Sequence, residues 1–104
     1  MQLWYVYIMT NKKEGVLYIG VTDNIEERVK EHKLKVYPRA FTAKYNCNKL
    51  IYFEEFVNGR EAEIRERQFK KWKREWKLKL IEVMNPSWMD LTLNWNLDYS
   101  NSRK

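Results

Sequence analysis

The chain alternates between short apolar runs and longer amphipathic stretches. Residues 3–9 (LWYVYIM) and 16–21 (VLYIGV) are continuously apolar and aromatic, and the polar segment TNKKEG lies between them. Runs of this length and composition favour strands, and the polar interruption favours a turn. A third run, 49–56 (KLIYFEEF), has the same character. The pattern predicts a hairpin over residues 3–21 and a third strand over 49–56.

The hairpin brings two tyrosines to one face of the predicted sheet. If Met9 and Val16 face each other across the turn, Tyr7 lies opposite Tyr18. Directly opposed residues of an antiparallel pair point to the same side. We therefore expect the two phenol rings to share one face, although aromatic residues also favour strands without any further role.

A first helix is predicted after the second strand. Asp23 is a candidate N-cap, with Glu26 three residues later as in a capping box. On a helical wheel with about 100° per residue, His32 lies on the same side as the apolar Ile25, and Arg28 lies at the border of that apolar side. We expect His32 to point inward. An inward histidine is also explained as a hydrogen-bonded structural residue.

Two further helical patterns follow the third strand. Asn58 with Glu61 starts the helix GREAEIRERQFKKW, and KREWKLKLIEVM is a third helix or a continuation that ends at Asn85 and Pro86. Residues 35–48 lack a clear period and are predicted to form a loop long enough to suggest a function.

These elements predict one α+β domain, a three-stranded antiparallel sheet flanked by helices, over residues 1–84. Residues 85–104 are expected to form an extension that packs in part on the domain before a frayed tail. The expected packing residues of the extension are Trp88, Met89 and Leu91.

Charge indicates the class of partner. The chain carries a formal charge of +6 and 15% aromatic residues, a combination that favours a polyanion, with nucleic acid first. Segment 60–79 holds nine basic and four acidic residues, hence +5 of that total. A solvated helix face explains its aromatic stripe but leaves the concentration of charge unexplained. The bias favours a surface that faces phosphates.

Several classes of protein are disfavoured. The sequence has neither an apolar run long enough to span a bilayer nor the pattern of a signal peptide, so we expect a cytoplasmic protein without a membrane partner. Cys47 is the only cysteine and His32 the only histidine. An internal disulfide is therefore impossible and a zinc site lacks ligands.

Glu66 is the sharpest anomaly in the second helical pattern. On a wheel with Ala62 at zero, Glu66 lies at about 40°, at the border of the apolar stripe, whereas Glu63 lies at about 100°, nearer solvent. A buried carboxylate needs a cation, a metal or a hydrogen-bond donor. An inward ion pair with Arg28 or Arg65 is the structural alternative to a functional role.

Considered together, five residues from different segments can converge on one side of the small sheet, as catalytic groups do. These are Tyr7, Tyr18, Arg28, His32 and Glu66.

The ordered set of motifs resembles the GIY-YIG nuclease superfamily, in particular its small stand-alone bacterial members. The resemblance rests on YVY at 5–7, YIG at 18–20, the helices of Arg28 and Glu66, and the stretches FTAKYN, LIYFE and RERQFKKWKR. Three positions, in two motifs, depart from the family pattern. Tyr5 and Val6 replace the glycine and isoleucine of the first motif, and Ala40 stands where glycine often precedes the FT pair.

The resemblance implies a three-stranded antiparallel sheet flanked by helices and hydrolysis of phosphodiester bonds with one divalent cation, Mg²⁺ or Mn²⁺. By analogy, Glu66 binds the metal, Arg28 steadies the phosphate and His32 assists proton movement. Tyr7, with Tyr18, positions or deprotonates the attacking water, and Tyr7 is our preferred base. A phenol with an ordinary pKa of about 10 needs nearby cations for this work, which Arg28 and the metal could supply.

The sequence therefore predicts a metal-dependent DNA endonuclease, a monomer or weak dimer, directed by DNA structure more than by sequence. One alternative is a nucleic-acid-binding module of the same fold with weak or no turnover, and another is a structural protein that meets an acidic partner. The cations expected to contact nucleic acid are Lys44, Lys70, Lys71, Lys73, Arg74 and Lys77.

Overall fold

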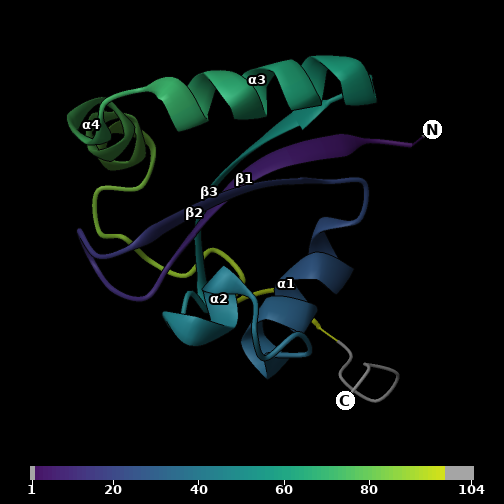
Figure 1. Ribbon diagram of the computed structural model, residues 1–104, viewed down its shortest axis with the longest axis vertical. Helices are drawn as coiled ribbons and strands as arrows, with labels where there is room; N and C mark the ends of the chain where they lie inside the picture. The colour runs from purple at the N-terminus through teal and green to yellow at the C-terminus, as the bar shows by residue number, and fades with distance from the viewer. Residues whose placement is uncertain (1, 98–104) are drawn as a thin grey trace.

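A computed structural model of the chain describes residues 2–97 (Figure 1). Its three strands are β1 (Trp4–Thr10), β2 (Leu17–Thr22) and β3 (Lys49–Phe56). They form one antiparallel sheet in the order β2-β1-β3, so β2 and β3 are its edges. The predicted three-stranded antiparallel sheet is confirmed.

Within the described residues 2–97, four helices cover the two faces of the sheet. They are α1 (Ile25–Leu34), α2 (Phe41–Lys44), α3 (Gly59–Lys71) and α4 (Arg74–Met84). Figure 1 shows α3 and α4 on one side of the sheet and α1 and α2 on the other, which confirms the α+β class. The backbone is extended at Trp72 and Lys73, so α4 is a separate helix. None of the helices described over residues 2–97 is long and apolar enough to cross a membrane.

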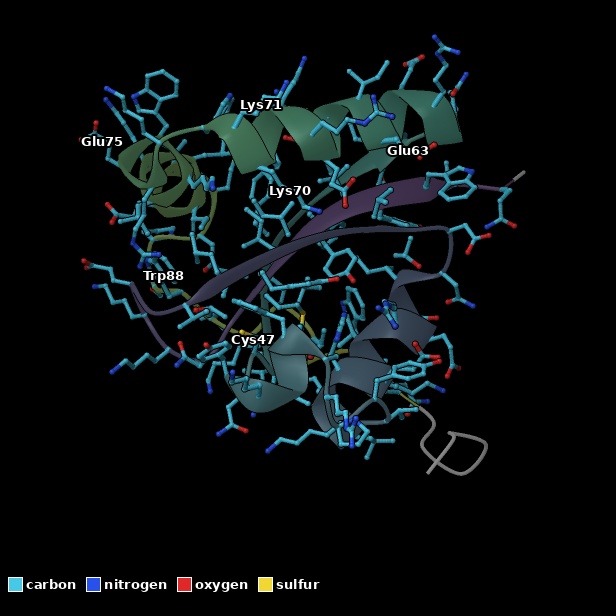
Figure 2. All side chains as sticks on the ribbon, in the orientation of Figure 1. Cys47, Glu63, Lys70, Lys71, Glu75 and Trp88 are labelled. Atoms are coloured by element: carbon cyan, nitrogen blue, oxygen red, sulfur yellow. The ribbon has the colours of Figure 1, made fainter. Side chains whose placement is uncertain are left out.

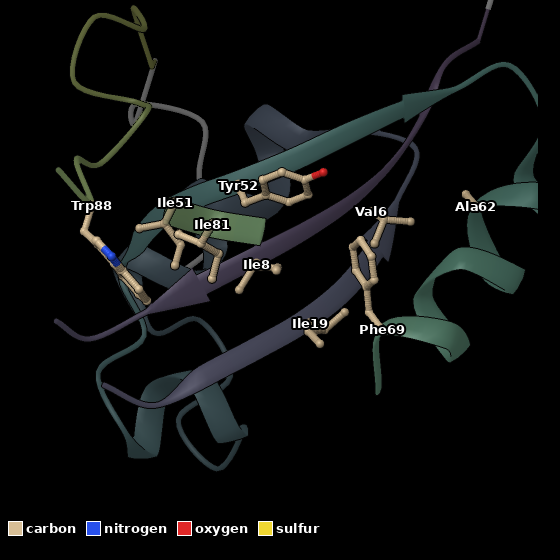
Figure 3. Packing of buried hydrophobic residues seen from close by; sticks show 9 residues of the cluster. All are labelled: Val6, Ile8, Ile19, Ile51, Tyr52, Ala62, Phe69, Ile81 and Trp88. Carbon is tan, nitrogen blue, oxygen red and sulfur yellow. The ribbon is translucent and has the colours of Figure 1, made fainter. Parts of the chain in front are cut away.

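Each face of the sheet carries its own hydrophobic core because alternate strand residues point to opposite sides. Val6 and Ile8 of β1 pack with Phe69 of α3, and Figure 3 shows this first core. Tyr7 and Met9 belong to the second core, which includes Ile25 and Val29 of α1. The helices that carry Glu66 and His32 therefore lie on opposite faces.

The register of the hairpin differs from the predicted one by two residues. Tyr7 pairs with Gly20, and Tyr18 pairs with Met9. Hydrogen bonds within the turn explain the shift, because the Asn11 side chain accepts from the Val16 amide and holds Val16 outside the ladder. A slip of two keeps every side chain on its face. Tyr7 and Tyr18 accordingly share one face, with ring centroids 6.1 Å apart.

Two local predictions were wrong. Asn24, not Asp23, is the N-cap of α1, and its side chain accepts from the amide of Glu27 at 3.2 Å. Residues 35–48 are not loop throughout, because α2 forms within them and buries Thr42. The prediction for α3 is confirmed, since the side chain of Asn58 caps its first turn.

The segment after α4 packs against both hydrophobic cores of the sheet. The side-chain amide of Asn85 donates to the carbonyl of Ile51, and Trp88 is buried in the first core. The Leu91 amide donates to the carbonyl of Leu50, and Asp90 pairs with Lys33 of α1 at 2.5 Å. The frayed tail expected at the C-terminus concerns residues 98–104, which lie outside the described residues.

Candidate active site

A buried chain of hydrogen bonds links β1, α1 and α2. The Tyr7 hydroxyl lies 2.9 Å from Nε2 of His32, and Nδ1 of His32 lies 2.8 Å from the hydroxyl of Thr42. The three residues are 1%, 5% and 3% exposed. Sequence reasoning placed Tyr7 and His32 but did not select Thr42. Its only signal was a hydroxyl residue inside the FTAKYN stretch.

His32 is neutral at pH 7. Its burial, and next the charge of Arg28, lower its pKa to about 4. A neutral imidazole donates through one ring nitrogen and accepts through the other, and hydroxyl groups can do either. The Tyr7–His32–Thr42 chain is thus able to transmit a proton in either direction. The inward orientation predicted for His32 is confirmed.

Burial makes Tyr7 a weaker acid than an ordinary tyrosine. Desolvation raises the pKa of Tyr7 well above its usual value, the neighbouring Tyr18 raises it further, and Arg28 acts in the opposite direction. Our expectation that nearby cations favour the phenolate of Tyr7 does not hold in this state, because burial outweighs Arg28. Tyr18 is only half-buried.

Arg28 lies beside both tyrosines and remains charged. Partial burial lowers the pKa of its guanidinium, but the hydrogen bond to Glu31 and the two phenols raise it to a net value above the usual one. Its Nη1 lies 2.8 Å from Oε1 of Glu31, and 31% of its side chain is exposed. Arg28 therefore offers a partly exposed positive charge at the site.

Gly20 makes room for the ring of Tyr7 on the neighbouring strand. A Cβ at Gly20 would lie 2.5 Å from the Tyr7 hydroxyl oxygen and 2.6 Å from Cζ. Contacts under 3.0 Å force a shift, and the Tyr7 ring has little room to yield at 1% exposure. The YIG motif thus has two roles at the site. Tyr18 provides one aromatic ring, and Gly20 leaves the space that the ring of Tyr7 occupies.

Gly20→Ala should therefore disturb the site more than the fold. We expect the added methyl group to displace the Tyr7 ring and break its bond with His32, so that any cleavage activity falls at least about tenfold. Cleavage rates and the ring-proton NMR signals of Tyr7 and His32 measure the two effects. Unchanged signals in Gly20→Ala contradict the packing argument.

Glu66 does not lie on the same face as the tyrosines, so the predicted convergence on one side of the sheet is wrong for this residue. It belongs to α3, which packs on the opposite face. The structural alternative, an inward ion pair of Glu66 with Arg28 or Arg65, is not formed either. Glu66 pairs with Lys70 at 3.0 Å and its side chain is 18% exposed, whereas Arg65 pairs with Glu54.

A hollow at the free edge of β2 joins the two faces. It measures about 280 Å³ and is lined by Tyr18 on β2, Phe41 on α2, and Lys70 and Lys77 from α3 and α4. Figure 2 shows Lys70 on the side of α3 that faces the sheet edge and Lys71 on the outer side of the helix, and the Lys70 side chain is 55% exposed. Glu66 does not line the hollow itself, and its carboxylate is connected to the hollow through its ion pair with Lys70 at 3.0 Å.

The other predicted nucleic-acid contacts are distributed differently. Lys77 lines the hollow, and its pKa is lowered by burial and next by the charge of Arg74. Arg74 donates to the carbonyl oxygens of Glu14 and Gly15, at 2.7 Å and 2.5 Å, and so fastens the hairpin turn. The three remaining cations are exposed and are not among the residues that line the hollow: Lys44, Lys71 and Lys73.

The donor set suits a weakly held hard cation. Over residues 2–97 no group of three or more His, Cys, Asp or Glu side chains could hold a metal ion. A single carboxylate suffices for Mg²⁺, which keeps several waters and takes further ligands from substrate phosphates. Lys70 is no obstacle, since exposed ion pairs contribute at most about 1 kcal/mol. The residues therefore fit a metal that binds together with substrate.

Comparison with known proteins identifies the class. Residues 3–79 match the model of the GIY-YIG catalytic domain. The chain belongs to the GIY-YIG family, the class of nuclease domains that its sequence motifs resemble.

The relatives come from one group of small bacterial proteins. A UPF0213 protein of Clostridium perfringens is 46% identical over 81 residues, which cover 74% of this chain and 81% of that protein. A UPF0213 protein of Syntrophus aciditrophicus is 38% identical, with coverage of 82% and 95%. The solution NMR structure of a UPF0213 protein of Bacillus halodurans superposes with a TM-score of 0.53 at 25% identity, covering 88% of this chain and 97% of that one.

Proposed function

We propose that the protein is a divalent-metal-dependent endonuclease that hydrolyses phosphodiester bonds in DNA and recognises DNA structure more than sequence. One observation carries the proposal: a cationic hollow on the sheet edge contains Tyr18 and Lys70, the partner of Glu66, next to a buried chain able to transmit a proton. Nucleic acid is the partner, and we place the protein in the cytoplasm as a monomer or weak dimer.

The positive groups of the site suit a phosphodiester. Lys70 and Lys77 line the hollow, and Arg28 stands beside Tyr18 with part of its side chain exposed. These charges bind the phosphate and oppose the negative charge that grows on it in the transition state. Glu66 would hold the Mg²⁺ or Mn²⁺ ion, which would supply further positive charge for the same purpose.

The positions of the two tyrosines favour Tyr18, and not Tyr7 as preferred from the sequence, as the residue that contacts the attacking water. Tyr18 lines the hollow, whereas Tyr7 is 1% exposed. We therefore assign the contact with the attacking water to Tyr18 and the onward transfer of its proton to Tyr7 and His32. A bound phosphate offsets the charge of Arg28, the second cause of the low pKa of His32, so substrate makes the imidazole a better proton acceptor.

A binding module without turnover is the second candidate. The specific observation in its favour is that Lys70 already occupies the carboxylate of Glu66, while Tyr7 lies buried with a raised pKa. Both features suit a surface that holds nucleic acid without cutting it.

A panel of DNA substrates separates the two functions. We expect the purified protein to nick or cut at least one of supercoiled, branched and single-stranded DNA with Mg²⁺ or Mn²⁺, and none with chelator. Gel electrophoresis reports cleavage, and a mobility shift reports binding. Binding to these substrates without cleavage under either metal would reject the nuclease and support the binding module.

A further inference from the structure

The segment between α1 and β3 exposes an unusual number of aromatic rings. Over residues 2–97 the exposed aromatic side chains are Tyr37, Phe41, Tyr45 and Trp76, each more than 40% exposed. Three of these four lie within residues 37–45. Exposed apolar groups gathered in one place mark a contact surface more often than rings scattered singly.

Two of the exposed rings, Phe41 and Tyr45, pack one after the other next to Tyr18. The ring centroids of Tyr45 and Phe41 are 4.7 Å apart, and those of Phe41 and Tyr18 are 6.0 Å apart. Phe41 also lines the hollow. Tyr45, Phe41 and Tyr18 thus form an aromatic row that runs from the surface of α2 to the place where we propose that the phosphate binds.

Cations accompany this aromatic row. Nζ of Lys44 lies 5.4 Å from the centroid of the Tyr45 ring, and Lys70 and Lys77 stand at the other end, in the hollow. Proteins that bind single strands combine rings on which bases stack with cations that follow the backbone. A duplex does not offer its base faces in this way, because each base is already covered by its neighbours.

We infer that the aromatic row binds unpaired nucleotides, so that the substrate is a single strand or a DNA with an unpaired segment at the cut. The cutting part rests on the proposed nuclease function, whereas the binding part does not. Packing within the protein does not account for the row, since Phe41 and Tyr45 keep 45% and 41% of their surface exposed. A base stacked on Phe41 puts its phosphate beside Lys70 and Tyr18.

Fluorescence anisotropy without divalent metal tests the inference directly. Labelled single-stranded DNA should bind more tightly than the duplex of the same sequence. The double variant Phe41→Ala/Tyr45→Ala should lose roughly tenfold or more of its affinity for the single strand, with little change for the duplex. Phe41→Tyr keeps a ring and should bind like the wild type.

A remote substitution and a fold check complete the experiment. Val83→Ala, on α4 and 72% exposed in the wild type, should leave affinity unchanged. Circular dichroism should show the wild-type fold in the double variant, as expected for exposed side chains. Equal affinity of the wild type for single strand and duplex, or an unaffected double variant, overturns the inference. Tight binding of single strands through the aromatic row without any cleavage rejects the nuclease and leaves the row supported.

Discussion

Glu66→Gln should abolish metal-dependent cleavage while the protein stays folded and still binds nucleic acid. The amide keeps the shape of the side chain but loses the charge that a hard cation requires. Loss of a catalytic metal removes several kcal/mol of transition-state stabilisation, which corresponds to a rate lower by at least about 100-fold. The measurement is the initial cleavage rate at several Mg²⁺ and Mn²⁺ concentrations.

The melting temperature of Glu66→Gln distinguishes a role of Glu66 in metal binding from a role in the fold. The partner of Glu66, Lys70, has 55% of its side chain exposed, so the substitution leaves no buried cation unpaired. An exposed pair four residues apart on a helix contributes about 0.3–0.5 kcal/mol, and the melting temperature should hardly change. A large fall in melting temperature means that Glu66 serves the fold and contradicts our assignment.

Glu63→Gln is the matched control, one turn earlier on the same helix and exposed to solvent. It removes the same charge and should retain the wild-type rate. If Glu63→Gln loses cleavage at unchanged stability, or Glu66→Gln cuts normally, Glu66 is not the metal ligand.

The sequence was informative where periodicity alone decides the structure. The three apolar runs became β1, β2 and β3, and the helical stripe predicted the burial of His32 correctly. The N-cap of α1 was wrong by one residue because Asp23 and Asn24 are adjacent and both can cap a helix. The hairpin register depended on the Asn11 side chain, whose hydrogen bond is not encoded in a hydrophobic pattern.

The site required information that a helical wheel does not contain. A wheel shows how far Glu66 lies from the apolar stripe but not which face of the sheet that stripe covers. With α3 and α1 on opposite faces, Glu66 and Tyr18 can meet only around the edge of β2. Thr42 was missed for a similar reason, because its partner His32 lies ten residues away on another helix.

The two tyrosines should differ when each is replaced by phenylalanine. Tyr18→Phe removes the hydroxyl that we place against the water and should slow cleavage by about 100-fold or more. Tyr7→Phe removes the partner of Nε2 of His32 in a buried place, so it should lower activity and also cost about 1–3 kcal/mol of stability. Cleavage rates and chemical denaturation of the two variants measure these effects.

The pair of measurements decides which tyrosine acts on the water. Under our assignment Tyr18→Phe loses activity at nearly wild-type stability, because Tyr18 is half-buried at the hollow while Tyr7 is enclosed. Our sequence-based preference for Tyr7 as the base makes the opposite forecast, with the larger loss of activity in Tyr7→Phe. Wild-type cleavage in both variants refutes a tyrosine mechanism altogether. If Tyr7→Phe is as stable as the wild type, the buried chain through His32 to Thr42 is not maintained in solution.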